Sequence, residues 1–172
     1  MARVTQLIYH PAFDPYNALL RSIRVLAALP LGIDPLTLRI LDFYLLFPER
    51  LINIRLTTQL RSAVRKLEAQ PRYPYDRLPA SRNIFERMAS SFDAALQTMT
   101  ARGLISSDEY TNHVNLRVET VPAELFALAL SQNESEGKLM SILVTLAAEF
   151  PLAGTNGIKD RSGLAEYRYD VV

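Results

Sequence analysis

The sequence contains no cysteine and only two histidines, His10 and His113, among its 172 residues. A chain without cysteine forms no disulfide and no thiolate-ligated metal site. The two histidines do not form a His-x-x-x-His pair, so the ligand set of a structural zinc site is also missing. We therefore expect neither a resident metal ion nor another cofactor.

Long apolar runs are missing as well. No run reaches the roughly 20 residues that span a bilayer, and the first residues lack the hydrophobic core of a signal peptide. A hydrophobic fraction of 49% with 22% charged residues is typical of a soluble globular protein. We therefore expect a cytoplasmic protein without membrane contact, with one well-buried core or two small lobes that share it.

Motifs of common catalytic chemistry are absent too. The sequence has no G-x-S-x-G nucleophile motif, and residues 153–163 (AGTNGIKDRSG) do not match the phosphate-binding spacing G-x-x-x-x-G-K-[ST]. His113 falls at the start of an expected strand, where a surface position is the simpler explanation. We expect no enzyme; the alternative is a triad assembled across the sequence, or a small hydrolase that uses His10.

Two helix starts can be predicted from local chemistry. Asp14 and Asp34 are preferred N-cap residues, and each is followed by a proline, Pro15 or Pro35, which has no N–H to lose at the first helical position. Apolar residues then recur with the helical period after each proline. The second of these helices (IDPLTLRILDFYLLF) is apolar on most sides, so we expect it near the centre of the core.

Further helices follow along the chain. The pattern predicts a strongly basic amphipathic helix over residues 54–69, then a loop over residues 70–81, which contain three prolines. The next helix is predicted to begin with Ser81 or Asn83 as its cap and to end at Gly103.

A β-hairpin is predicted directly after Gly103. In LISSDEYTNHVNLRVE (residues 104–119), Val114, Leu116 and Val118 alternate with polar residues, as in a half-buried strand. Two helices, then a third helix and then a β-hairpin form the element order of a winged helix-turn-helix. Beyond it, Pro122 opens a helix, a second helix follows, residues 151–163 read as a loop, and the end is a short strand or a tail.

The expected fold is therefore α+β and mostly helical, with a winged helix-turn-helix core and extra N-terminal and C-terminal helices. We place the N-terminal helix and the winged helix in residues 1–120. Residues 121–172 are expected to form a helical extension, which packs on the first part or docks a partner.

Charge is distributed unevenly although the net charge is only +1. From Arg50 to Arg87 there are nine basic residues against three acids, whereas the chain from Glu119 onward has eight acids against four bases. This indicates two surfaces with different partners, or solvated helix faces that happen to be rich in arginine. The candidate nucleic-acid-binding residues are Arg61, Arg65, Lys66, Arg82, Arg87, Arg102 and Arg117.

Two acids, Glu86 and Asp93, interrupt the helix that would enter a DNA groove. They favour contact with the phosphate backbone, or no contact at this helix, over the reading of bases.

Residues 8–120 resemble a known family. The resemblance rests on the Pro-x-Phe-Asp-x-Tyr opening of YHPAFDPYNALLRSIRVLAAL, on the LDFYLLFP helix and on the ARGLI junction into the hairpin. These features are similar to the middle component of bacterial ABC three-component systems, the small subunit of Lamassu-type anti-phage and anti-plasmid defence operons.

The resemblance implies a non-catalytic adaptor. In that family the middle component resembles winged-helix subunits of SMC complexes, and it bridges an SMC-like ABC ATPase, which senses DNA, to an effector that is often a nuclease. The ATPase and nuclease activities would then belong to the partners, and DNA contact through the complex is possible. The alternative is a free-standing, homodimeric winged-helix transcription regulator.

Aromatic residues ahead of a helix make good interface anchors when they are exposed. We expect the partner interface to include Tyr9, His10, Phe13, Tyr16, Arg21 and Arg24. The alternative is that Phe13 and Tyr16 staple the first helix onto the chain's own core.

Overall fold

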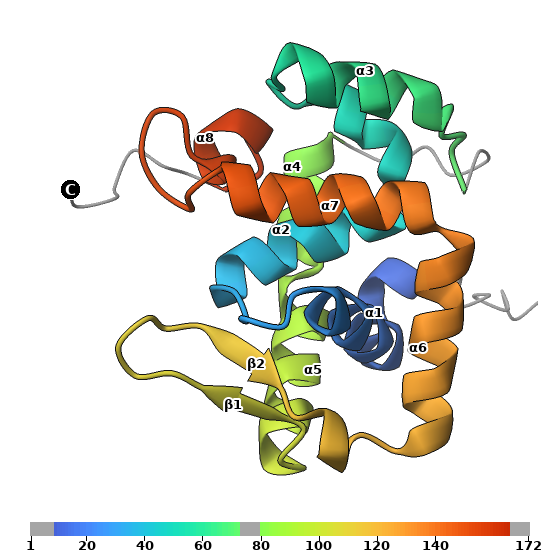
Figure 1. Cartoon of the computed structure of the whole chain (residues 1–172), viewed down its shortest axis with the longest axis vertical. Helices are drawn as coiled ribbons and strands as arrows, with labels where there is room; N and C mark the ends of the chain where they lie inside the picture. Colours follow the sequence, from blue (N-terminus) through green and yellow to red (C-terminus); the bar gives the residue numbers. More distant parts are fainter. Residues whose placement is uncertain (1–8, 73–79, 166–172) are drawn as a thin grey trace, which may run out of the picture.

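Helices make up most of the computed structural model, which describes residues 9–72 and 80–165 (Figure 1). In chain order the elements are η1 (Pro11–Phe13), α1 (Pro15–Ala28), α2 (Pro35–Leu46), η2 (Pro48–Asn53), α3 (Thr58–Leu67), α4 (Ser81–Arg87), α5 (Ala89–Ala101), β1 (Ile105–Ser107), β2 (Val114–Leu116), η3 (Val118–Thr120), α6 (Ala123–Ser135), α7 (Gly137–Glu149) and α8 (Ile158–Ser162). The mostly helical α+β class is thus confirmed. The expected final strand or tail and most of the proline-rich loop lie outside the described residues.

The two predicted helix starts are confirmed. The Asp14 carboxylate accepts the Tyr16 N–H at 2.8 Å, and the Asp34 carboxylate accepts the Leu36 N–H at 2.7 Å. In both helices a proline occupies the first position after the cap. Each carboxylate therefore satisfies an N–H group that has no partner inside its helix.

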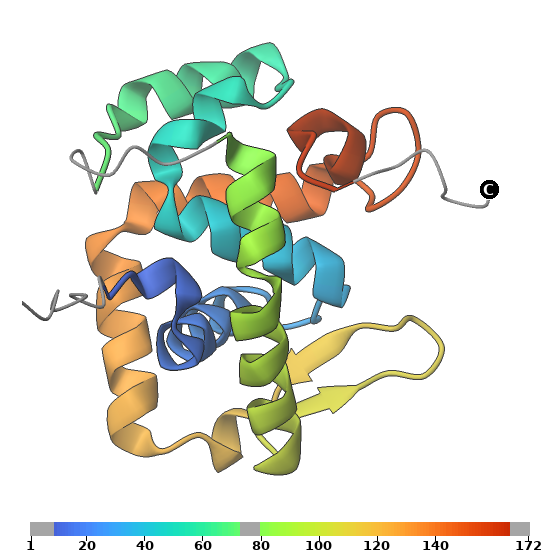
Figure 2. The ribbon, with the colours of Figure 1, turned by 180° about the vertical axis from the view of Figure 1, so that it is seen from behind.

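Helix α2 forms the centre of the core. Nine of its 12 residues are buried, as expected of a helix that is apolar on most sides. Helix α1 and helix α7 pack against it. Figures 1 and 2 together show α7 on one side of α2 and the α4–α5 pair on the other. Because α6 also packs on α1, the predicted C-terminal extension lies against the N-terminal part of the chain.

The small sheet is attached to the connection between α1 and α2. Strands β1 and β2 are antiparallel, with Ile105 opposite Leu116. Ile33 and Val114 exchange both backbone hydrogen bonds, at 3.2 and 2.9 Å. The order across the sheet is therefore Ile33, β2, β1. The predicted hairpin is confirmed, and so is the helix stop at Gly103, which has a left-handed φ of +66°.

The third helix begins later than predicted. Helix α3 starts at Thr58, with the Thr57 hydroxyl accepting the Leu60 N–H at 3.4 Å, rather than at Ile54. The reason lies far along the chain: the Arg55 N–H donates to the Arg161 carbonyl, and the Arg161 guanidinium donates back to the Arg55 carbonyl at 2.8 Å. These bonds hold the residues before α3 in an extended conformation.

Three other predictions need correction. The helix expected between residues 81 and 103 is two helices, α4 and α5, which meet at Met88, and Ala80 rather than Ser81 or Asn83 is its N-cap. Residues 151–163, predicted as a loop, contain α8. Val118 lies in η3 and is exposed, so it does not belong to the buried face of β2.

A buried ion pair joins the first elements of the chain. Arg21 contacts both oxygens of Asp42, through Nε at 2.6 Å and Nη2 at 3.3 Å, and its Nη1 donates to the Pro11 carbonyl at 3.2 Å. Burial raises the pKa of Asp42 above its ordinary value, and the Arg21 charge opposes this rise. One guanidinium thus connects η1, α1 and α2.

Replacing Arg21 by Met should destabilise the protein by about 3–5 kcal/mol, because Asp42 is left buried without its cation. The double variant Arg21→Met/Asp42→Leu should recover most of this loss. Without Arg21 the folded-state pKa of Asp42 rises further above its unfolded value. The loss of folding stability should therefore be small in acid and should grow as the pH rises through that raised pKa. Urea unfolding between about pH 4 and about pH 8 measures this; a pH-independent loss would contradict it.

Replacing Gly32 by Ala should be more costly than the same change at Gly163. Both residues have a left-handed φ, +69° and +66°, which costs Ala about 1 kcal/mol. A Cβ at Gly163 meets open space, whereas a Cβ at Gly32 collides with Asn115 and the Val114 carbonyl. We expect Gly32→Ala to lose at least about twice the stability that Gly163→Ala loses. Equal losses in urea unfolding would argue against a tight junction between β2 and the α1–α2 connection.

Candidate partner-binding and nucleic-acid-binding surfaces

Tyr9 and Tyr16 present their rings to solvent at the start of α1, with 67% and 84% of each residue exposed. The Tyr9 hydroxyl donates to the Asp14 carboxylate and accepts from the Asn17 amide. The hydrogen bond from Tyr9, with those from the Tyr16 and Asn17 N–H groups, holds the pKa of Asp14 below its ordinary value. Among the predicted partner-interface residues, these two tyrosines have the most exposed rings.

His10 and Phe13 lie against the chain's own core. The His10 Nδ1 accepts the Ala12 N–H at 3.1 Å and so caps η1, and the His10 ring stacks 6.2 Å from Phe47. Phe13 is half-buried and lies under the guanidinium of Arg87, 4.7 Å from the ring centre. Phe13 therefore packs against the chain's own core, whereas Tyr16 is exposed.

The structure corrects the prediction that Arg21 and Arg24 face a partner, because both are buried. Arg24 donates from Nε to Asn133 Oδ1 at 2.9 Å and from Nη2 to Glu136 Oε2 at 2.6 Å. The Asn133 amide donates back to the Arg24 carbonyl at 2.9 Å. Arg24 therefore fastens α6 to α1, just as Arg21 fastens α2.

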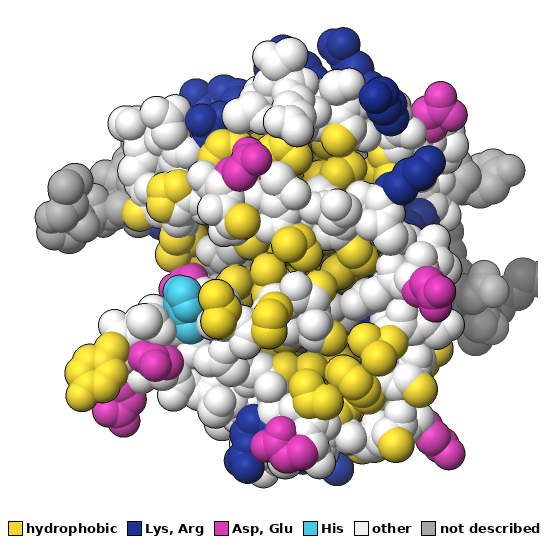
Figure 3. All heavy atoms as spheres, viewed as in Figure 1, with side chains coloured by type: hydrophobic (Ala, Val, Ile, Leu, Met, Phe, Trp, Pro, Cys, Tyr) yellow, Lys and Arg dark blue, Asp and Glu magenta, His cyan; other side chains and the backbone are white. Residues whose placement is uncertain are grey.

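Three of the candidate nucleic-acid-binding residues share the outer side of α3. Arg61, Arg65 and Lys66 are exposed, and no carboxylate among the described residues lies within ion-pair distance of Arg65 or Lys66. Figure 1 places α3 at one end of the long axis, and Figure 3 shows Lys and Arg side chains gathered there. We call Arg61, Arg65 and Lys66 the α3 basic face.

The other four candidates do not join this face. Arg82 pairs with Glu86 at 3.1 Å and Arg117 pairs with Glu119 at 3.3 Å. Arg87 covers the ring of Phe13, and Arg102 is exposed just after the end of α5. Figure 1 places the end of α5 and both strands far from α3 along the long axis. The seven predicted residues thus do not form one surface.

A cleft of about 650 Å³ brings together one residue from each predicted set, Tyr16 and Arg102. Its walls come from the start of α1, from the end of α5 with the residues after it, and from the start of α6 with the segment before it. They include Leu19, Leu104 and Leu125. Sequence reasoning missed this juxtaposition, because Tyr16 and Arg102 are 86 positions apart and no local pattern connects them.

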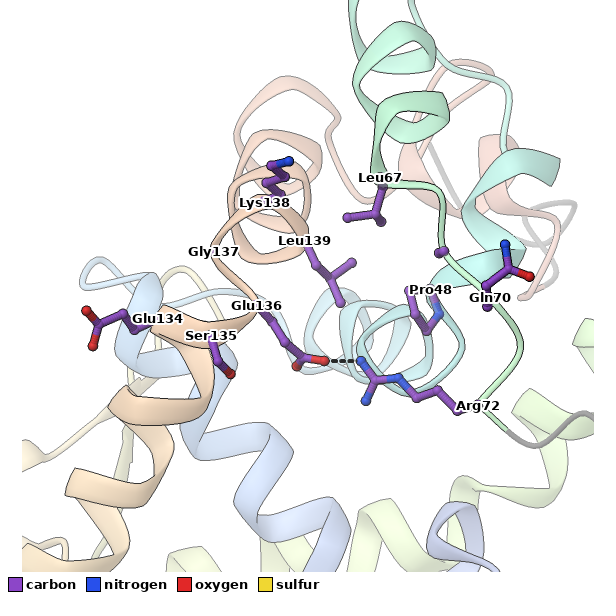
Figure 4. Close-up of a pocket in the computed structure, with 11 residues that line it drawn as sticks. Pro48, Leu67, Gln70, Arg72, Glu134, Ser135, Glu136, Gly137, Lys138 and Leu139 are labelled. Carbon is purple, nitrogen blue, oxygen red and sulfur yellow. Dashed lines mark hydrogen bonds and ion pairs between the residues drawn. The ribbon is translucent and has the colours of Figure 1, made fainter.

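A second pocket, of about 660 Å³, opens beside the junction of α6 and α7 (Figure 4). Pro48, Leu67 and Leu139 line its apolar side, and an ion pair between Arg72 and Glu136 closes its edge. Glu136 binds Arg24 with its other oxygen. This cluster could not be found from the sequence, because its partners are separated by 64 and 112 positions and no local pattern connects them.

The described residues contain neither a cluster of potential metal ligands nor a helix that could span a membrane. Across residues 9–72 and 80–165, no three His, Cys, Asp or Glu side chains are grouped so that they could hold a metal ion. Over the same residues, no helix combines the length and the apolar character needed to cross a membrane.

Comparison with known families identifies the chain as a component of an ABC-three component (ABC-3C) system. The matching family model is ABC-3C system Middle Component 5, and it covers residues 7–170, so the chain belongs to this family. The match includes the C-terminal helices, which the expected resemblance did not cover. A middle component of a multi-component system implies protein partners. Searches of curated proteins and of solved structures found no match.

Proposed function

We propose that this chain is a non-catalytic, cytoplasmic adaptor that connects an SMC-like ABC ATPase to an effector, often a nuclease, in a Lamassu-type defence system. The observation that carries the proposal is the family match over residues 7–170, because a middle component belongs to a system with other subunits. The exposed rings of Tyr9 and Tyr16 support it, since exposed aromatic side chains are frequent anchors of protein interfaces.

The topology supports a winged-helix core for this adaptor. The order α1, Ile33, α2, α5, β1, β2 is that of a winged helix, and the pairing of Ile33 with Val114 supplies the third position of its small sheet. On this assignment η2, α3 and α4 lie between the second and third helices, and η2 and α3 form an insertion ahead of the α4–α5 pair. The α3 basic face then belongs to an added element rather than to the common core.

The α3 basic face supports contact with the DNA backbone within the complex. Its cations are exposed, and two of them are without carboxylate partners among the described residues, which leaves them available to phosphate. Helix α5, the recognition helix of a winged helix, contains no Lys or Arg but does contain Asp93. This favours the adaptor over a free-standing transcription regulator, which would read bases with α5.

Replacing Tyr16 by Ala should weaken binding to the ATPase or the effector by about tenfold or more while the melting temperature stays unchanged. The reason is that the ring is exposed and lies outside the core. Titration calorimetry with the purified neighbouring subunits measures the affinity, and Tyr110→Ala, which removes a ring that is 98% exposed on the hairpin, is the matched control. Unchanged affinity for both subunits would remove Tyr16 from the interface.

The double variant Arg65→Glu/Lys66→Glu should weaken binding of the assembled complex to duplex DNA. It should also lower the slope of log K against log salt by about 0.9 for each DNA phosphate that the variant no longer neutralises. Arg117→Glu, at the other end of the molecule, is the control. If DNA affinity and slope stay the same across a salt titration, the α3 basic face serves a protein partner instead.

A further inference from the structure

Helix α6 exposes apolar side chains that its sequence would place in a core. Its first eight residues, AELFALAL, contain one charged side chain, yet Ala129 is the only fully buried residue of the whole helix. Leu128 and Leu130 are each 46% exposed. A helix that is apolar on nearly all sides is normally enclosed by other elements. In the described chain α6 is covered on one side only.

This exposure does not come from a loosely attached helix. The second half of α6 is fastened to α1 by the reciprocal hydrogen bonds of Arg24 and Asn133, at 2.9 Å each. Glu136, directly after the helix, binds Arg24 at 2.6 Å. Polar bonds therefore hold α6 in place, and the outward side of its apolar half is left free of contacts that the fold needs.

The charges beside the exposed leucines all have one sign. Glu124 lies one turn before Leu128, and Glu134 lies one turn after Leu130, so each leucine has a carboxylate as its neighbour on the helix surface. Both glutamates are exposed, and neither pairs with a cation among the described residues. The sequence has no Lys or Arg from Val118 to Gly137.

Figure 3 shows hydrophobic side chains gathered over α1 and α6, with acidic side chains at the edge of this region. An apolar surface with acidic borders is complementary to an apolar stripe with basic borders. It repels nucleic acid and other anionic partners. Helix α3 of a second copy fits poorly, because its outer side is polar and basic without an apolar stripe.

We propose that the outer side of α6, formed by Ala127, Leu128 and Leu130 with Glu124 and Glu134, binds an amphipathic helix of a partner subunit. The apolar stripe of that helix packs on the leucines, and Lys or Arg on its flanks pair with the two glutamates. We call this surface the α6 face. The inference rests on the proposed adaptor function, because it requires a protein partner, and it adds where that partner binds and what its surface contains.

The test uses the full chain and the two subunits encoded with it, the ATPase and the effector, each purified. The double variants Leu128→Ser/Leu130→Ser and Glu124→Lys/Glu134→Lys should each weaken binding to the same subunit by about tenfold or more. The effect of the glutamate variant should shrink as salt rises. The control for the leucine variant is Ile52→Ser, because Ile52 has the size of leucine, lies away from α6 and is 66% exposed. The control for the glutamate variant is Glu109→Lys/Glu149→Lys. Both controls should bind within about twofold of the wild-type affinity.

A photo-reactive benzophenone side chain at position 128 identifies the occupant. We expect it to cross-link a partner peptide with Lys or Arg at helical spacing beside apolar residues. Cross-linking to a second copy of the chain, or tighter binding by Glu124→Lys/Glu134→Lys, would overturn the inference. If the wild-type chain binds a subunit and both double variants bind that subunit with unchanged affinity, the inference is overturned too. The adaptor function is then left intact. Failure of the wild-type chain to bind either subunit overturns the adaptor function itself.

Discussion

The buried ion pair between Arg21 and Asp42 determines how the first half of the chain is arranged. A carboxylate with no exposed surface is tolerated because a bidentate guanidinium compensates it. The same guanidinium holds the Pro11 carbonyl, so the turn before α1 is placed by the interaction that places α2. Arg24, one turn further along α1, repeats this device towards α6 through Asn133 and Glu136. Helix α1 therefore acts as the axis of the molecule, and both of its arginines are internal connectors rather than surface charges.

The fixed position of α1 determines which side chains remain exposed to a binding partner. Since α1 is fixed along its length, Tyr16 at its start stays exposed beside a cleft whose far wall comes from the C-terminal region. The α3 basic face lies at the other end of the long axis (Figure 1). Helix α6, which carries the α6 face, is held by polar bonds at its C-terminal end and is apolar in its first half. These surfaces differ in chemistry and in position, which suits a chain that contacts several partners at once.

Local chemistry made some features predictable. Asp14 and Asp34 cap their helices through bonds to residues two positions away, Gly103 stops a helix by its own φ, and the hairpin follows from alternation. Features that depend on distant residues were not predictable. The late start of α3 depends on Arg161, and the burial of Arg21 and Arg24 depends on carboxylates on other helices. An arginine in a helical pattern reads as solvent-facing because no sequence signal identifies the acid that will neutralise it.

Helices α3 and α6 show how the unevenly distributed charges of the chain are placed on its surface. The sequence suggested a basic middle and an acidic end, with ordinary solvated faces as the alternative. On α3 the cations stand on a polar surface, which suits phosphate and needs no apolar contact. On α6 the carboxylates stand beside exposed leucines, and a solvated face has no need of leucine at such positions. The two surfaces therefore favour different partners by charge and by hydrophobicity together. The adaptor proposed above would hold two such partners without competition, because neither partner's surface complements the other site.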